Sequence, residues 1–64
     1  MKARFDDHVI TVREVPLSDG SVLPEGTNGF VIETFESPET YEVEFDLDDG
    51  LILAAVQPED IGVA

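Results

Sequence analysis

The chain contains no cysteine, so it can form neither a disulfide framework nor a zinc site with thiolate ligands. Packed side chains must hold the fold, and a reducing cytoplasm fits this composition. No apolar run approaches the roughly 18 residues that cross a membrane, and no charged start leads into an apolar stretch of signal-peptide length. We therefore expect a soluble, cytoplasmic protein with no membrane partner.

Basic residues are almost as scarce. The chain has three basic residues, Lys2, Arg4 and Arg13, and fifteen acidic residues, which gives a formal net charge of −12 at pH 7. Binding to a phosphate backbone needs the opposite sign, so we expect no nucleic-acid partner. A disordered acidic tail is the alternative, but 42% hydrophobic residues in alternating patterns favour a folded chain with an acidic surface.

The length of 64 residues allows one domain, which covers residues 1–64 and leaves no room for a cleft between domains. Ordering the chain costs roughly 1.5 kcal/mol per residue, and apolar burial in so small a fold only just exceeds the total. Self-association or a binding partner could therefore supply part of the stability.

Short β-rich segments alternate with turn residues along the first half of the chain. A strand closed by a proline is predicted at His8–Val15, followed by a long loop over 16–29. Within that loop, Asn28-Gly29 is typical of a turn that can take positive φ. Phe30–Phe35 is predicted as a second strand, and because both of its faces carry apolar residues, its inward face stays open.

The second half carries the clearest pattern. From Tyr41 to Asp48, apolar residues alternate strictly with acids, which is typical of a half-buried strand. Asp49-Gly50 predicts a two-residue hairpin turn, and Leu51–Val56 returns antiparallel. A short helical turn is expected at 58–60 and a last short strand at 61–63. No segment has a helical period, so we predict an all-β fold in which four or five short strands form a closed or nearly closed barrel.

Several turn and core motifs together resemble the short bacterial proteins of the domain of unknown function 4926 family. The motifs are Gly26-Thr-Asn-Gly29, Val31, Tyr41-Glu-Val-Glu-Phe45, Asp49-Gly50 and Pro58-Glu-Asp60. The resemblance runs from about Asp7 to about Ile61 and implies a five-stranded SH3-like barrel without established catalytic residues. Members of such families are suspected to be partners of a neighbouring protein, sometimes as an antitoxin or immunity component.

The Gly-x-x-Gly-x-Val portion also resembles KOW-type barrels, but this chain lacks their basic residues.

Other candidate chemistry is weak. His8 is the only histidine and has no ligand-spaced partners, and the acidic run from Asp46 to Gly50 fails the spacing of a calcium loop, which needs glycine sixth and glutamate twelfth. No serine has a neighbouring base in sequence. We therefore predict no catalytic, cofactor-binding or metal-ligating residues, and no enzyme.

The hairpin yields a sharper hypothesis through its register. With Asp49-Gly50 as the loop, the inward pairs are Leu47–Ile52, Phe45–Ala54 and Val43–Val56. The outer face then sets Asp48, Asp46 and Glu44 opposite Leu51, Leu53 and Ala55. No base on the return strand neutralises these acids, so something is expected to cover the face, unless a bulge shifts the register or a loop covers the leucines.

The predicted docking surface is made of Glu42, Glu44, Asp46, Asp48, Leu51 and Leu53. In the first reading, the protein is a non-catalytic interaction module, of the antitoxin or immunity type, whose acids dock a basic protein partner around the leucines. In the alternative, it is a homodimeric structural or assembly protein that packs Leu51 and Leu53 against a second copy.

Overall fold

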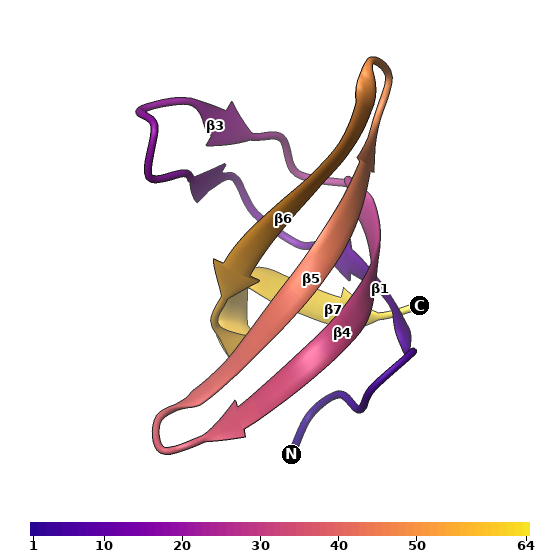
Figure 1. Cartoon of the computed structure of the whole chain (residues 1–64), viewed down its shortest axis with the longest axis vertical. Coiled ribbons are helices and arrows are strands. Elements are labelled where there is room, and N and C mark those ends of the chain that lie inside the picture. The colour runs from indigo at the N-terminus through magenta and orange to yellow at the C-terminus, as the bar shows by residue number, and fades with distance from the viewer.

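The computed structural model describes all 64 residues, and the predicted all-β class is confirmed. A single turn of 3-10 helix, η1 (Pro58–Asp60), lies where a short helical turn was expected (Figure 1). The strands are β1 (His8–Thr11), β2 (Val15–Pro16), β3 (Val22–Leu23), β4 (Asn28–Glu36), β5 (Glu39–Leu47), β6 (Gly50–Val56) and β7 (Ile61–Val63).

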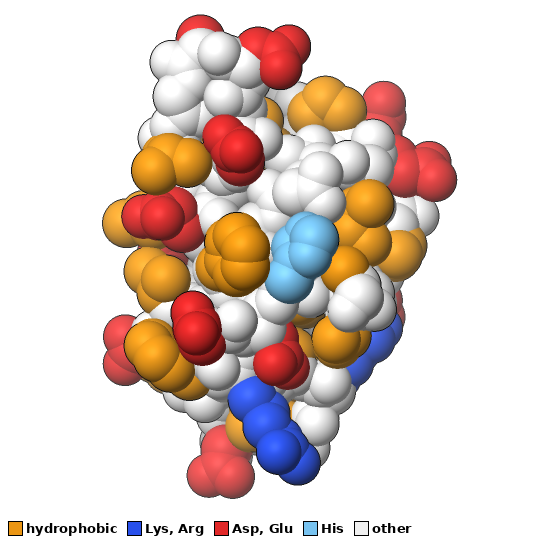
Figure 2. Space-filling view, turned by 90° about the vertical axis from the view of Figure 1, so that its right-hand side faces the viewer, with side chains coloured by type: hydrophobic (Ala, Val, Ile, Leu, Met, Phe, Trp, Pro, Cys, Tyr) orange, Lys and Arg blue, Asp and Glu red, His pale blue; other side chains and the backbone are white.

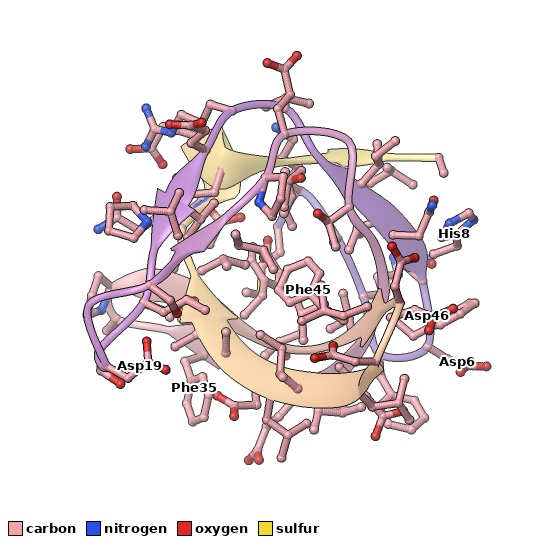
Figure 3. The ribbon with its side chains drawn as sticks, turned by 90° about the horizontal axis from the view of Figure 1, so that it is seen from above. Asp6, His8, Asp19, Phe35, Phe45 and Asp46 are labelled. Atoms are coloured by element: carbon pink, nitrogen blue, oxygen red, sulfur yellow. The ribbon has the colours of Figure 1, made fainter.

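Five of the strands form one antiparallel sheet in the order β6-β5-β4-β1-β7, and β2 and β3 form a separate two-stranded ladder. The sheet is strongly curved, so that Phe45 lies inside the curve and Phe35 outside it (Figure 3). The two edge strands, β6 and β7, do not pair with each other. The backbone ladders therefore do not close into the predicted SH3-like barrel.

The core is built chiefly from the alternating side chains of β5. Tyr41, Val43 and Phe45 are fully buried, as their alternation with acids predicts. The other buried apolar residues come from every part of the chain: Ala3, Val9, Val15, Leu23, Val31, Val56 and Ile61. Burying these side chains is the main favourable term in folding, because no disulfide is available.

The first predicted strand is shorter than the sequence indicates, because its ladder stops at Thr11. The Thr11 hydroxyl donates to the carbonyl of Pro24 at 2.8 Å and accepts from the backbone N–H of Thr27, also at 2.8 Å. The next residue, Val12, donates its N–H to the carbonyl of Asp60 at 2.9 Å. These bonds turn the chain away from the five-stranded sheet after Thr11, and Val15 then belongs to the separate β2–β3 ladder.

Asn28-Gly29 is not a turn, contrary to the sequence prediction. Both residues lie in β4, and Gly29 pairs with Val9 of β1 and Phe45 of β5. The glycines with positive φ are Gly20, Gly26 and Gly50. Glycine is required at position 29 because the neighbouring strand β5 approaches closely.

The β5–β6 hairpin has the predicted faces but a different register. The two-residue loop is Asp48-Asp49, so Phe45 pairs with Ile52 and each partner lies two residues earlier than expected. A shift of two keeps every side chain on its predicted face. In the observed register Tyr41 pairs with Val56, the last residue of β6.

Tyr41 anchors the amino-terminal segment to this hairpin. Its hydroxyl accepts the backbone N–H of Ala3 at 3.1 Å and donates to the carboxylate of Glu39. Burial raises the pKa of Tyr41, and the hydrogen bond to Glu39 raises it further. The backbone N–H of Lys2, followed by the Tyr41 hydroxyl, lowers the pKa of Glu39. The neutral phenol and the ionised carboxylate therefore stabilise the folded state together.

We expect the protein to lose stability in alkali because of Tyr41. A raised folded pKa contributes stability that is complete below the ordinary value of about 10 and is lost as the pH rises through the folded value. Tyr41→Phe should flatten this alkaline decline and cost about 1–2 kcal/mol at neutral pH, since it leaves the Ala3 N–H without a partner. Urea unfolding from pH 7 to pH 11 tests both points.

The control is internal, because Tyr41 is the only tyrosine and the chain has no tryptophan. An ultraviolet titration of tyrosinate formation therefore reports this one group. An ordinary tyrosine titration in the folded protein, or an alkaline decline unchanged by Tyr41→Phe, would contradict the assignment.

Candidate functional site

The predicted docking residues lie together on the convex side of the hairpin, with one exception. Glu42, Glu44 and Asp46 point outward from β5 and pair across the ladder with Ala55, Leu53 and Leu51 of β6. Leu51 and Leu53 are 61% and 59% exposed, so no loop covers them. Asp48 belongs to the turn and not to the strand, because the hairpin register is shifted.

The structure adds an apolar row on the other side of the acids, which the sequence pattern left open. Phe30 of β4 pairs with Glu44 and is 50% exposed, and Phe35 is 46% exposed further along the same strand. A β-bulge between Val31 and Glu33 changes the side-chain alternation, so apolar residues with different sequence parity reach the outside. Periodicity alone cannot locate such a bulge.

We call this convex surface of β4, β5 and β6 the outer face. Three acids lie in a row along β5, namely Glu42, Glu44 and Asp46. Exposed apolar side chains lie on both sides of this row: Phe30 and Phe35 of β4, which flank Glu33, and Leu51 and Leu53 of β6. Hydrophobic and acidic side chains also intermingle where the surface continues round to the only histidine (Figure 2).

His8 of β1 lies beside Phe30 of β4. Its ring stacks on Phe30 with 5.2 Å between centroids, and its Nε2 lies 2.9 Å from the amide oxygen of Asn28. No group of three or more histidine or acidic side chains is placed to hold a metal ion. No helix is long and apolar enough to span a membrane.

The acids of the outer face have no cationic partners. The protein's single ion pair joins Arg13 Nε to Asp60 Oδ1 at 2.7 Å, away from this face, and the Lys2 ammonium donates to the carbonyl of Pro58. Alternate carboxylates on a strand stand about 7 Å apart and repel by roughly 0.6 kcal/mol per pair in water. Glu33 also pairs directly across the sheet with Glu42, which is an unfavourable like-charge pair.

Salt should therefore stabilise the isolated protein. Raising the ionic strength from about 0.01 M to 0.15 M shortens the Debye length from roughly 30 Å to 8 Å and screens this repulsion. We expect the melting temperature to rise by several degrees, since about 1 kcal/mol corresponds to roughly 4–8 °C in a domain of this size. A melting temperature that stays constant or falls as sodium chloride is added would show that the charges of these acids are already compensated.

A groove of about 660 Å³ lies beside the outer face, between the β2–β3 ladder and β6. One wall is the edge of β6 with Ile52 and Ala54, and the opposite wall includes Leu17 and Val22. None of the residues that line it is basic, whereas Asp19, Glu42 and Asp49 all contribute to it. The groove was not predicted, because it depends on how a loop packs beside a strand far along the chain.

Asp19 is fixed as an anion at this groove. The Ser21 hydroxyl and the Ser21 backbone N–H donate to its Oδ1 at 2.5 and 2.9 Å. These hydrogen bonds, the hydroxyl first, hold the pKa of Asp19 below its ordinary value. The groove therefore keeps a negative charge at its β2–β3 end throughout the neutral pH range.

Comparison with known proteins gives no relative: no protein-family model, no curated protein and no solved structure matches the chain. The resemblance to the domain of unknown function 4926 family stays a prediction.

Proposed function

We propose that the protein is a non-catalytic interaction module that docks a basic protein on its outer face. The observation that carries this proposal is the row of three acids without cationic partners, Glu42, Glu44 and Asp46, with exposed apolar side chains of β4 and β6 on both sides. Interfaces combine an apolar centre with charges that steer the encounter, and a chain of net charge −12 attracts basic partners over long range.

The curved sheet also suits this role. The β-sheet holds the acids at fixed spacing. Binding a partner with matching basic residues therefore costs this protein little conformational entropy. We assign the sheet to the SH3-like kind as part of this proposal. The resemblance to the domain of unknown function 4926 family supports the same class of function, namely a partner of the antitoxin or immunity type.

The test is a charge reversal with a matched control. Replacing Glu42, Glu44 and Asp46 together with lysine should lower the association rate constant for the basic partner by 10-fold to 1000-fold, roughly the range of electrostatic steering. The control replaces three exposed acids elsewhere, Glu14, Glu25 and Glu59, and so changes the net charge equally. Candidate partners are the purified products of adjacent genes, measured by stopped flow at low and physiological salt.

An equal loss of rate in both variants would mean that only net charge matters, and the outer face would not be the docking site. Light scattering behind a sizing column distinguishes the homodimer. A dimer of the protein alone that persists in salt and is broken by Leu53→Glu would replace the proposal with self-assembly, whereas a monomer that enters a salt-sensitive complex supports it.

A further inference from the structure

The free edge of β6 lacks the devices that normally protect an edge strand. β6 (Gly50–Val56) is seven residues long, pairs with β5 on one side only and contains no charged residue and no proline. Natural edge strands usually carry lysine, proline or a bulge, or are covered by another segment. The other edge strand, β7, is only three residues long and needs less protection.

The register of the hairpin fixes which backbone groups of β6 are unpaired. The two-residue loop makes Leu47 and Gly50 a hydrogen-bonded pair, and such pairs alternate along an antiparallel ladder. Phe45–Ile52 and Val43–Ala54 are then hydrogen-bonded pairs as well. The N–H and C=O groups of the intervening residues, Leu51, Leu53 and Ala55, therefore point away from β5.

These three residues point their backbone groups toward the side on which the groove lies. The β2–β3 ladder stands on the side of β6 that is turned away from β5 (Figure 1), and the groove of about 660 Å³ lies between them. Asp19 lies on the loop that joins β2 and β3 (Figure 3). The groove thus offers unpaired main-chain donors and acceptors, apolar walls and only negative charges.

We infer that this groove binds an extended peptide segment that alternates apolar and basic residues, and that the segment adds to the free edge of β6 as a further strand. Strand addition derives affinity from main-chain hydrogen bonds and specificity from alternate side chains. The inference rests on the proposed function, because the segment belongs to the same basic partner. The inference gives the proposed function a binding mode, strand addition, and a second binding surface, the groove, beside the outer face.

Charge decides between this occupant and a second copy of the chain. Pairing two β6 edges would bring together two molecules that each carry a net charge of −12. Asp19, Glu42 and Asp49 of each groove would then meet only further acids near the contact. A segment with lysine or arginine at alternate positions places a cation near these carboxylates while its apolar side chains face the walls.

The experiment measures amide hydrogen exchange by NMR on the intact protein, with an acetylated and amidated peptide of four Lys-Val repeats as the probe. We expect the amides of Leu51, Leu53 and Ala55 to become protected about tenfold or more, as in other strand additions. The amides of Ile52 and Ala54 already bond to β5, so their protection should change little. This alternation is specific to a strand paired at the free edge.

Two controls isolate the main-chain bonds. The first is the same peptide with an N-methyl group on every residue, which keeps its charge and side chains but has no N–H to give to a strand on either edge. The second compares Leu53→Pro, which removes an outward N–H and blocks the edge, with Leu53→Ala, which removes only the exposed side chain. We expect the methylated peptide and Leu53→Pro to lose binding at least tenfold. Leu53→Ala should lose clearly less than Leu53→Pro, because it removes a side chain that lines the groove but keeps the outward N–H.

Several outcomes would overturn the inference. The first is absence of peptide binding at millimolar concentration. The second is a change in the NMR signals of Glu42, Glu44 and Asp46 alone. It would exclude strand addition and leave the outer face as the docking site. Protection of the edge that grows with protein concentration in the absence of peptide would assign β6 to a second copy. The peptide could protect alternate amides of the β6 edge while charge reversal on the outer face leaves the association rate of the basic partner unchanged. That result would contradict the proposed function alone and leave strand addition standing.

Discussion

Replacing Gly29 with alanine is expected to remove a large part of the protein's stability. A Cβ at this position would lie 2.7 Å from Val43 Cγ1, 2.8 Å from Phe45 Cδ1 and 2.9 Å from the backbone oxygen of Glu44. Both side chains are fully buried and the third atom is main chain, so none can move aside freely. Such overpacking costs about 1–3 kcal/mol or more, against the roughly 3–5 kcal/mol that a domain of this size possesses.

Gly62→Ala is the matched control, because Gly62 also lies in a strand of the same sheet. Its Cβ would meet only Val12 Cγ1, at 3.3 Å, and Val12 is half exposed and can turn away. We expect thermal unfolding followed by circular dichroism to show a melting temperature lower by roughly 10–20 °C for Gly29→Ala and by only a few degrees for Gly62→Ala. Similar values for the two variants would disprove the close approach at Gly29.

Gly29 also shows where sequence reasoning reaches its limit. An Asn-Gly pair favours a turn by its local conformational freedom, and that preference predicted a turn at 28–29. In the structure the glycine serves a contact with Val43 and Phe45, which are distant in sequence. A single sequence holds no local signal for such an approach, since the packing of β5 on β4 creates it.

The alternation in β5 could be predicted well because it is local and strong. Each acid from Glu42 to Asp46 faces outward, and Tyr41, Val43 and Phe45 face inward, since a strand has a side-chain period of two. The register of the hairpin was two residues in error, because turn chemistry favoured Asp49-Gly50 over the observed Asp48-Asp49. Gly50 instead begins β6 with φ of 139°, a conformation that suits glycine.

Features that depend on the whole fold could not be predicted. The bulge in β4, which exposes Phe30 and Phe35 beside the acids, depends on pairing with β5. The groove depends on the β2–β3 ladder, whose strands have two residues each and no recognisable pattern. The acids and leucines of the proposed docking surface could therefore be predicted from the sequence, whereas Phe30, Phe35 and the groove could not.

Removing the Asp60 side chain should be nearly as damaging as the substitution at Gly29. Asp60 is 8% exposed, and its two carboxylate oxygens accept the backbone N–H of Gln57 at 2.9 Å and Arg13 Nε at 2.7 Å. These bonds join η1 to the segment after β1. Hydrogen bonds to a charged group contribute about 1.5–3 kcal/mol, and the Arg13 bond counts for less because that side chain is half exposed.

We therefore expect Asp60→Ala to lower the free energy of unfolding by about 2–3 kcal/mol. Asp46→Ala is the matched control, since it removes the same charge from an exposed aspartate whose neighbours are other acids. In urea unfolding it should leave stability unchanged or raise it slightly, because it relieves repulsion on the outer face. Equal destabilisation by the two variants would mean that the Asp60 bonds contribute little, whereas opposite signs would show that the position of an acid decides whether it stabilises or destabilises this fold.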